Sequence, residues 1–205
     1  MHPRTIGLRQ VPTLVFGPGS LALCRDHLQV TGATRILAIT SPSNRRYAEQ
    51  LLNAFPHPKI DDTIRAEPTI AMFEATLTQA RAFAPDLIVG IGGGSPLDVA
   101  KLIAALTNST QSITEVFGIG NLTVRTLPLI CVPTTAGTGS EVSPNAILLD
   151  ESEQMKKGVI SPHLVPDATF VSLQPGLGER RRDDRSVVAI AAGGLHFGQR
   201  DLAGE

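Results

Sequence analysis

The sequence predicts an α/β fold with a doubly wound, mostly parallel sheet. Short apolar runs alternate along the chain with amphipathic stretches, which is the order expected for strands joined by helices. The strand candidates are apolar throughout, as in residues 127–132, and this is typical of strands covered on both faces. Glycine- and threonine-rich loops follow two of these runs, and ligands of such sheets bind where strands end in loops.

Five apolar runs are expected to form the main sheet. The first is closed by a Gly-Pro-Gly turn signal, and the fifth is stopped by Pro133. Further along, two segments flank a polar turn that begins at Glu151, which predicts a β-hairpin. In chain order the predicted strands are residues 13–16, 35–40, 60–64, 86–90, 127–132, 145–150 and 156–161.

Apolar residues at helical spacing predict the helices between these strands. Ser20 is expected to cap the first helix, because its hydroxyl can accept a bond from a free backbone N–H. The expected apolar faces are Leu21, Cys24 and Leu28 in the first helix, Tyr47, Leu51 and Ala54 in the second, Ile70, Phe73, Leu77, Ala80 and Ala84 in the third, and residues 99–106 in the fourth.

Composition excludes several classes of protein. The chain has 205 residues, of which 42% are hydrophobic, enough to bury a core. Lys and Arg number 18 against 19 Asp and Glu, and this balance argues against a nucleic-acid-binding face. Cys24 and Cys131 show no metal-ligand spacing, and no apolar run approaches the roughly 20 residues that span a bilayer. We therefore expect a cytoplasmic protein without a membrane partner.

The domain organisation is expected to change near residue 175. Residues 1–175 carry the strand and helix pattern of one α/β domain. Residues 176–205 contain a charged run, a run of small residues and a polar end. We expect this segment to be a divergent tail, either disordered or unrelated to the domain before it.

The loop after the fourth predicted strand is a candidate anion site. Gly92, Gly93 and Gly94 remove every side chain from the turn, so that a diphosphate can approach the backbone N–H groups. Ser95 is expected to cap the next helix, and Asp98 to complete a capping box. The helix N-terminus adds a partial positive charge. The alternative is a tight turn that needs glycine only for packing.

The second loop follows the fifth predicted strand and places hydroxyl groups beside two glycines. Thr134, Thr135 and Thr138 can bond phosphate, ribose or carboxamide groups without the cost of burying a charge. The alternative is that Thr138 or Ser140 caps a following helix. Glu141 is expected to be a carboxylate at the start of a helix, where the dipole favours it, and the alternative is a catalytic role.

Two motifs carry a family resemblance. Gly-Gly-Gly-Ser-Pro-Leu-Asp-Val-Ala-Lys at 92–101 and Pro-Thr-Thr-Ala-Gly-Thr-Gly-Ser-Glu-Val at 133–142 resemble the iron-containing (group III) alcohol dehydrogenase family. Residues 16–20 and 156–167 match it too, so the resemblance covers about residues 10–172. Dehydroquinate synthase and glycerol dehydrogenase share the broader fold, but the second motif points to the alcohol dehydrogenase branch.

The resemblance implies a Rossmann-like domain, similar to the N-terminal domain of dehydroquinate synthase, that binds NAD or NADP. Its first loop, with Gly93, Gly94 and Ser95, would face the cofactor diphosphate. The threonines of the second loop, Thr134, Thr135 and Thr138, would line the nucleotide and nicotinamide side. Lys156 matches a hairpin lysine that contacts the cofactor in the family. The alternative for this residue is a solvated surface lysine.

Ser41 stands where the family often has an aspartate that holds the adenosine ribose. A carboxylate would repel the 2′-phosphate of NADP, whereas serine with Arg45 and Arg46 nearby can accept it. NADP therefore stays open beside NAD. The alternative is that both arginines are solvated residues at the start of a helix.

The family resemblance ends before the family's metal ligands. The family continues with a helical C-terminal domain, in which Asp-x-x-x-His and two later histidines bind a divalent metal, iron or zinc. Asp183 and Asp184 have no histidine four residues on, and His196 stands without acidic neighbours. We assign no metal ligand. We interpret the segment after Gly176 as an altered or out-of-frame end of a truncated dehydrogenase.

By resemblance, the expected function is reversible hydride transfer between NAD(P) and an alcohol, aldehyde or ketone. We expect this activity to be impaired in the chain by itself, because one domain supplies neither the second wall of the cleft nor the metal. One alternative is a maleylacetate-reductase-like or other metal-independent reductase, and another is a non-catalytic nucleotide-binding remnant. Self-association through an exposed domain face is also expected.

Overall fold

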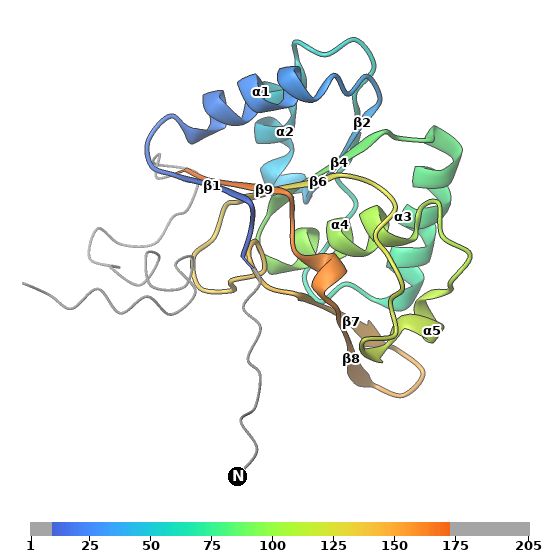
Figure 1. Ribbon diagram of the computed structural model, residues 1–205. Coiled ribbons are helices and arrows are strands. Elements are labelled where there is room, and N and C mark those ends of the chain that lie inside the picture. Colours follow the sequence, from blue (N-terminus) through green and yellow to red (C-terminus); the bar gives the residue numbers. More distant parts are fainter. Residues whose placement is uncertain (1–9, 173–205) are drawn as a thin grey trace, which may run out of the picture.

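The computed structural model describes residues 10–172, and a six-stranded sheet forms its centre (Figure 1). Every pairing in this sheet is parallel, so the prediction of a mostly parallel sheet is confirmed. The strands are β1 (Thr13–Phe16), β2 (Ile36–Ile39), β3 (Lys59–Asp61), β4 (Leu87–Gly92), β6 (Leu129–Pro133) and β9 (Ala168–Val171), and their order across the sheet is β1-β9-β6-β4-β2-β3.

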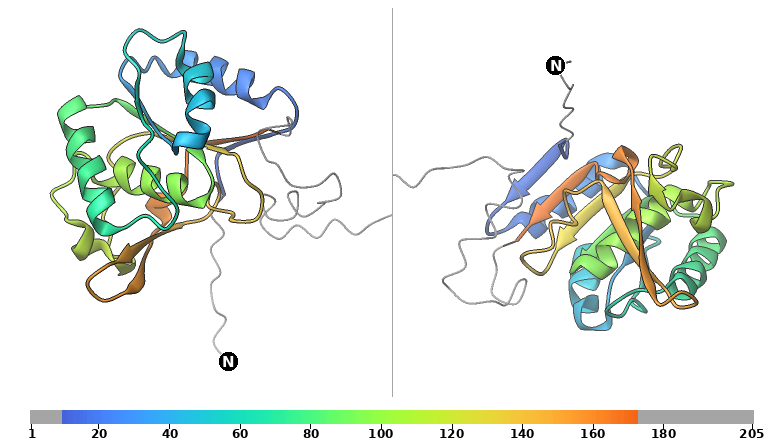
Figure 2. Two further views of the ribbon diagram at one scale, coloured as in Figure 1. Left: turned by 180° about the vertical axis from the view of Figure 1, so that it is seen from behind. Right: turned by 90° about the horizontal axis from the view of Figure 1, so that it is seen from below.

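Helices cover both faces of the sheet, as a doubly wound fold requires. The helices α1 (Ser20–Thr31) and α2 (Arg45–Leu52) lie on one face (Figures 1 and 2). The other face carries α3 (Ile70–Phe83) and α4 (Gly94–Leu106). Two short 3-10 helices, η1 (Pro42–Asn44) and η2 (Pro162–Leu164), begin at prolines.

The direction of winding reverses between β2 and β4. The chain runs outward from β2 to β3 at the sheet edge and returns to β4 on the other side of β2. The connections leaving β2 and β4 therefore pass to opposite faces and leave a crevice at the carboxyl ends of these two strands. Ligands of doubly wound sheets bind at such a reversal.

A second, smaller sheet lies beyond α4. It contains β5 (Gly118–Ile119), β7 (Asn145–Asp150) and β8 (Met155–Ile160), in the order β5-β8-β7. The strands β7 and β8 pair antiparallel, which confirms the predicted hairpin. A short helix, α5 (Ile113–Val116), precedes β5. A backbone bond of 2.9 Å from Leu149 N to Pro68 O ties the hairpin to the segment before α3.

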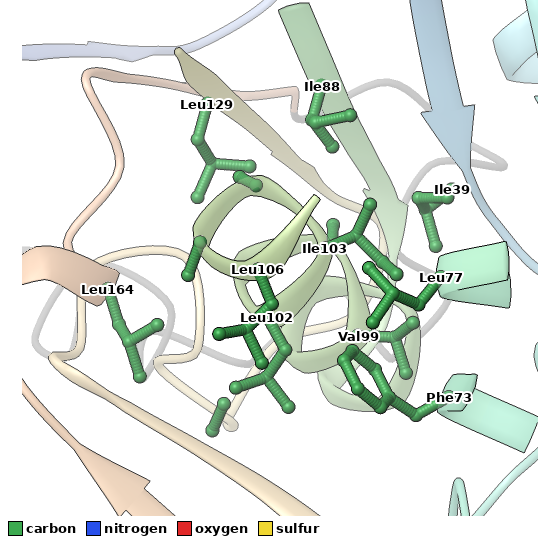
Figure 3. Packing of buried hydrophobic residues seen from close by; sticks show 14 of the residues in the cluster. Ile39, Phe73, Leu77, Ile88, Val99, Leu102, Ile103, Leu106, Leu129 and Leu164 are labelled. Atoms are coloured by element: carbon green, nitrogen blue, oxygen red, sulfur yellow. The ribbon is translucent and has the colours of Figure 1, made fainter. Parts of the chain in front are cut away.

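Helix α4 is the centre of the larger core. All its residues from Pro96 to Leu106 are buried, and all of them except Asp98 and Lys101 are apolar. Figure 3 shows Val99, Leu102 and Ile103 packed among side chains from the sheet and from α3, with the fully buried Phe73 beside them. A second core under α1 and α2 includes Cys24, and both cysteines are free and buried.

Several local expectations are wrong. Ser20 is the first residue of α1, whose N-cap is Gly19, and its hydroxyl makes no capping bond. Ala54 is exposed, because α2 ends at Leu52. Helix α4 begins earlier than expected, with Gly93 as N-cap, so Ser95 lies inside the first turn and does not cap it. No helix follows the second loop, which leads directly into β7.

The short elements α5, β5 and β9 carry too few residues for a periodic signal and were not predicted. The boundary expected at residue 175 and the tail 176–205 lie outside the described residues. In the part of the chain that the structure describes, no helix is long and apolar enough to cross a bilayer.

Candidate functional site

The first glycine loop is shaped by close contacts that exclude side chains. Gly92 has φ 146°, and a Cβ there would lie 2.8 Å from Cγ of Pro96, so only glycine fits. Helix α4 starts two residues later, and its N-terminus receives no side-chain capping bond. Its first backbone N–H groups therefore remain available to an anion, where the helix dipole also favours negative charge.

The second loop lies directly against the first. Thr134 N donates to Gly92 O over 2.9 Å. A Cβ at Gly93 would lie 3.0 Å from Oγ1 of Thr135, and one at Gly94 would lie 3.2 Å from Cγ2 of Thr138. Thr134 is buried, whereas Thr135 and Thr138 are exposed. The structure thus brings together the two loops that the sequence singled out.

Two cavities meet at the N-terminus of α4. The β2-side cavity, of about 410 Å³, is lined by Ser41, Ser43 and Arg65 together with residues 93–96. The hairpin-side cavity, of about 270 Å³, shares Gly94 and Ser95 and extends under the hairpin. Its other polar lining comes from Glu67, Asp98, Thr138, Ser140, Asn145 and Lys156.

Ser41 follows β2, where its hydroxyl accepts a bond of 2.9 Å from Nδ2 of Asn44. Arg45 bonds instead to Glu49 and Asp62, at 2.8 and 3.1 Å. Arg46 stacks on the ring of its neighbour Tyr47. Neither arginine lines the cavity beside Ser41. This agrees with the alternative interpretation, in which both arginines are solvated residues at the start of a helix.

Arg65 is the cation of the β2-side cavity that the sequence did not single out. It follows the short strand β3 and lies beside the cavity only because β3 and β2 are neighbours in the sheet. Arg65 is exposed, and it is the basic residue among those that line this cavity.

Asp98 joins segments that are far apart in the sequence, and it takes no part in a capping box. Its Oδ1 accepts a bond of 2.5 Å from Oγ of Ser140, and its Oδ2 accepts one of 3.1 Å from the backbone N of Ile147. Burial raises the pKa of this carboxyl, although Lys101 and both hydrogen bonds favour the charged form. The capping prediction is wrong because α4 begins four residues before Asp98.

Lys101 is fully buried one turn further along α4, and the sequence interpretation gave it no role. Its Nζ donates to Ser143 O at 3.0 Å, to Ser143 Oγ at 3.2 Å and to Asn145 O at 2.9 Å. The signal available in the sequence was a lysine, three residues after Asp98, in a helix whose remaining residues from 96 to 106 are apolar, because buried charges require partners.

Lys156 lies on β8 and forms an ion pair with Glu67, with 2.9 Å between Nζ and Oε1. Glu67 has φ 53°, an uncommon backbone conformation for glutamate, and the bond with Lys156 lowers its pKa. Both side chains are more than half exposed, and both line the hairpin-side cavity. Lys156 is thus solvated, as expected for the alternative of a surface lysine, and it also borders the candidate site.

Glu141 is buried in the second loop, where a helix-start carboxylate was expected. Its backbone O accepts a bond of 2.6 Å from Thr169, while its Oε2 has no hydrogen-bond partner among the described residues. Burial raises the pKa of this carboxyl. The expectation is wrong because no helix begins here.

Within residues 10–172, no group of three His, Cys, Asp or Glu side chains is placed to hold a metal ion. The described residues therefore do not offer the ligand set that an iron or zinc site needs. Asp183, Asp184 and His196 lie outside the described residues.

The fold and the two loop motifs define a Rossmann-like α/β domain of the dehydrogenase type. The family model of the iron-containing alcohol dehydrogenases matches residues 12–172, and the chain belongs to this family. The chain is 28% identical over 174 residues to sulfoacetaldehyde reductase of Bilophila wadsworthia, covering 82% of this chain and 45% of that protein. It is 32% identical over 173 residues to a probable alcohol dehydrogenase of Salmonella typhimurium, covering 78% and 42%.

Solved structures show the same relationship. An alcohol dehydrogenase from Oenococcus oeni has a TM-score of 0.77 and 25% identity, covering 84% of this chain and 47% of that chain. Sulfoacetaldehyde reductase from Bifidobacterium kashiwanohense, solved in complex with NAD+, has a TM-score of 0.74 and 25% identity, covering 83% and 46%. The chain spans about half the length of the curated relatives it matches.

Proposed function

We propose that residues 10–172 bind NAD or NADP and form the cofactor half of an oxidoreductase acting on an alcohol, aldehyde or ketone. The observation that supports this is the meeting of two cavities at the uncapped N-terminus of α4. A dinucleotide has this form, with a diphosphate between two nucleoside groups. A glycine loop that presents backbone N–H groups and the N-terminus of a helix both favour binding of an anionic diphosphate.

Each residue group has a separate part in the proposal. The backbone of Gly92, Gly93, Gly94 and Ser95 holds the diphosphate, and Ser41 holds the adenosine ribose. On the other side, the hydroxyls of Thr134, Thr135 and Thr138 line the nucleotide, and Lys156 contacts it from the hairpin. Asp98 acts here by fixing the walls of the cavity through Ser140 and Ile147.

When bound, the cofactor supplies a nicotinamide ring that accepts a hydride from the carbinol carbon or returns it. The chain's own residues bind and orient the dinucleotide, which places the ring at the hairpin-side cavity. The family is named for iron, but residues 10–172 do not fit a metal, and no step of the proposal runs through one. The substrate class is inferred from the relatives, which include sulfoacetaldehyde reductase, lactaldehyde reductase and a probable alcohol dehydrogenase.

Calorimetric titration with NAD and with NADP tests the proposal. Gly93→Val should weaken binding by roughly ten-fold or more, because the branched side chain would occupy the diphosphate position and press on Thr135. Gly158→Val is the matched control: a Cβ there meets its nearest atom, Ala146 O, at 3.8 Å, and Gly158 is not among the residues that line either cavity. Equal binding by wild type and Gly93→Val would remove the proposed diphosphate position.

Two further expectations stay predictions. Purified chain incubated with NAD and an alcohol tests turnover, and binding without turnover would favour the nucleotide-binding remnant. Self-association is measured by sedimentation velocity, and Leu14 and Phe16 on the edge strand β1 are exposed apolar side chains that can take part.

A further inference from the structure

Lys101 carries a charge into the most apolar part of the molecule. Its side chain is fully buried, and its neighbours on α4 are core residues such as Leu102 (Figure 3). Burial of an ammonium group is strongly unfavourable unless its donors are satisfied, and burial lowers the pKa of this lysine. A lysine at this position therefore needs a hydrogen-bond acceptor for each of its three N–H groups.

Those partners lie where the second loop joins the start of β7. The ammonium donates to two carbonyls and one hydroxyl, all from Ser143 and Asn145, at 2.9 to 3.2 Å. Three donors thus meet three acceptors, the full capacity of a lysine. Ser143 lies between the second loop and β7, outside any helix or strand, and its backbone N donates to Gly139 O over 3.0 Å.

Asp98 extends the same attachment to both ends of the segment. It lies 3.9 Å from the ammonium and holds Ser140 on one side and Ile147 on the other. Two charged residues on successive turns of α4 therefore fix residues 140–147 at four places. Ser140, Asn145 and Ile147 all line the hairpin-side cavity.

Two more titratable groups face Lys101. Glu141 comes from the second loop and Cys131 from β6. Burial raises the pKa of the Cys131 thiol to about 12 and also raises that of Glu141. Asp98 is the carboxylate that forms an ion pair with Lys101, with 3.9 Å between Oδ1 and Nζ.

We propose that Lys101 is a positioning residue of the dinucleotide site, which sets the cavity wall by holding the main chain of residues 143–145. This inference rests on the proposed function, since it assigns the hairpin-side cavity to the cofactor. Lys101 does not touch the ligand. Lys101 acts on the cavity wall through the backbone carbonyls of Ser143 and Asn145. It also acts through its neighbour Asp98, which bonds to Ser140 and Ile147.

The experiment separates positioning from a contribution to stability alone. Lys101→Met keeps the length of the side chain and removes all three bonds. Leu102→Ala truncates the adjacent core residue and leaves these three bonds in place. Both should lower the melting temperature. Lys101→Met alone should weaken NAD(P) binding, by roughly ten-fold or more, measured by calorimetry where each variant is folded. Leu102→Ala should stay within about two-fold of wild type.

Amide hydrogen exchange in the ligand-free chain gives an independent readout. Lys101→Met should speed exchange at Ser143 and Ile147, whose amides bond to Gly139 O and to Asp98, while β4 amides stay protected. Ser143→Ala removes one of the three acceptors, should weaken binding several-fold, and decides the matter if Lys101→Met does not fold.

Three results have distinct meanings. Weaker binding and faster exchange confined to the lysine and serine variants support the inference. Lys101→Met or Ser143→Ala with the affinity and exchange of wild type would overturn it, as would equal losses of affinity in Leu102→Ala. A wild-type chain that binds neither NAD nor NADP would instead overturn the proposed function, and the exchange data would still show whether Lys101 holds the segment.

Discussion

Glu67 and Lys156 form an ion pair at the rim of the hairpin-side cavity, with 2.9 Å between carboxylate and ammonium. Glu67 precedes α3 and Lys156 lies on β8. They meet because a backbone hydrogen bond from Leu149 N to Pro68 O joins the hairpin to the segment before α3. A dinucleotide that needs Lys156 must therefore compete with Glu67. Both side chains are exposed, so this competition is weak and sensitive to salt.

Glu67→Gln should release Lys156 and tighten NAD(P) binding by roughly two- to five-fold at low ionic strength. The gain should shrink as salt is added, because screening weakens the ion pair in wild type. Calorimetry over a salt series measures it. Glu74→Gln, which removes an exposed carboxylate from α3, is the control and should change nothing. If Glu67→Gln binds like wild type at every salt concentration, Lys156 is not a cofactor contact.

Arg65→Ala should lower the affinity for NADP more than that for NAD. Arg65 lines the β2-side cavity near Ser41, where a 2′-phosphate would lie, and a guanidinium favours a phosphate over two hydroxyls. Arg45→Ala is the matched control, since its guanidinium is engaged by Glu49 and Asp62. Paired titrations with both cofactors give the ratio of affinities. An equal fall of that ratio in both variants would contradict the assignment of Arg65.

Glu141→Gln should stabilise the chain at pH 8 and not at pH 4. Burial raises the pKa of Glu141 above its ordinary 4.5, so the unfolded state loses the proton first as the pH rises. The free energy of unfolding therefore falls between the two pKa values and stays lower above them. Glutamine cannot ionise and avoids this loss. Urea denaturation at both pH values measures the difference.

The control for this measurement is Glu151→Gln in the exposed hairpin turn, which should show the same small effect at both pH values. A gain from Glu141→Gln that is as large at pH 4 as at pH 8 would mean that ionisation of this carboxyl does not limit stability.

Gly90→Ala should destabilise the chain by about 1–3 kcal/mol through overpacking between β4 and α4. A Cβ at residue 90 would lie 2.8 Å from Cβ of Ala100, closer than packed carbons approach. Urea denaturation of the two single variants and of Gly90→Ala with Ala100→Gly forms a double-mutant cycle. Ala100→Gly should be less destabilising in the Gly90→Ala chain than in wild type, because it removes the atom that the new Cβ approaches. Strict additivity would show that this contact does not set the spacing of strand and helix.

The sequence was sufficient to predict the helices α1 to α4, most strands of the two sheets and the two loops, but not α5, β5 or β9. Apolar spacing is a local property, so the helix of residues 70–83 and the hairpin of residues 145–160 were predicted almost to their ends. The glycines at 92–94 and the threonines at 134–138 follow neighbouring strands, and a parallel sheet brings such strand ends together.

What only the tertiary structure decided is the set of partners of each polar side chain. Asp98 was predicted from its local spacing to cap a helix, but it bonds instead to Ser140, 42 residues away. Lys101, Arg65 and the pairing of Glu67 with Lys156 depend in the same way on which segments are neighbours. A periodic pattern in the sequence indicates which face of a helix or strand is buried. The hydrogen-bond partner of a polar side chain depends instead on which distant segment packs against that face.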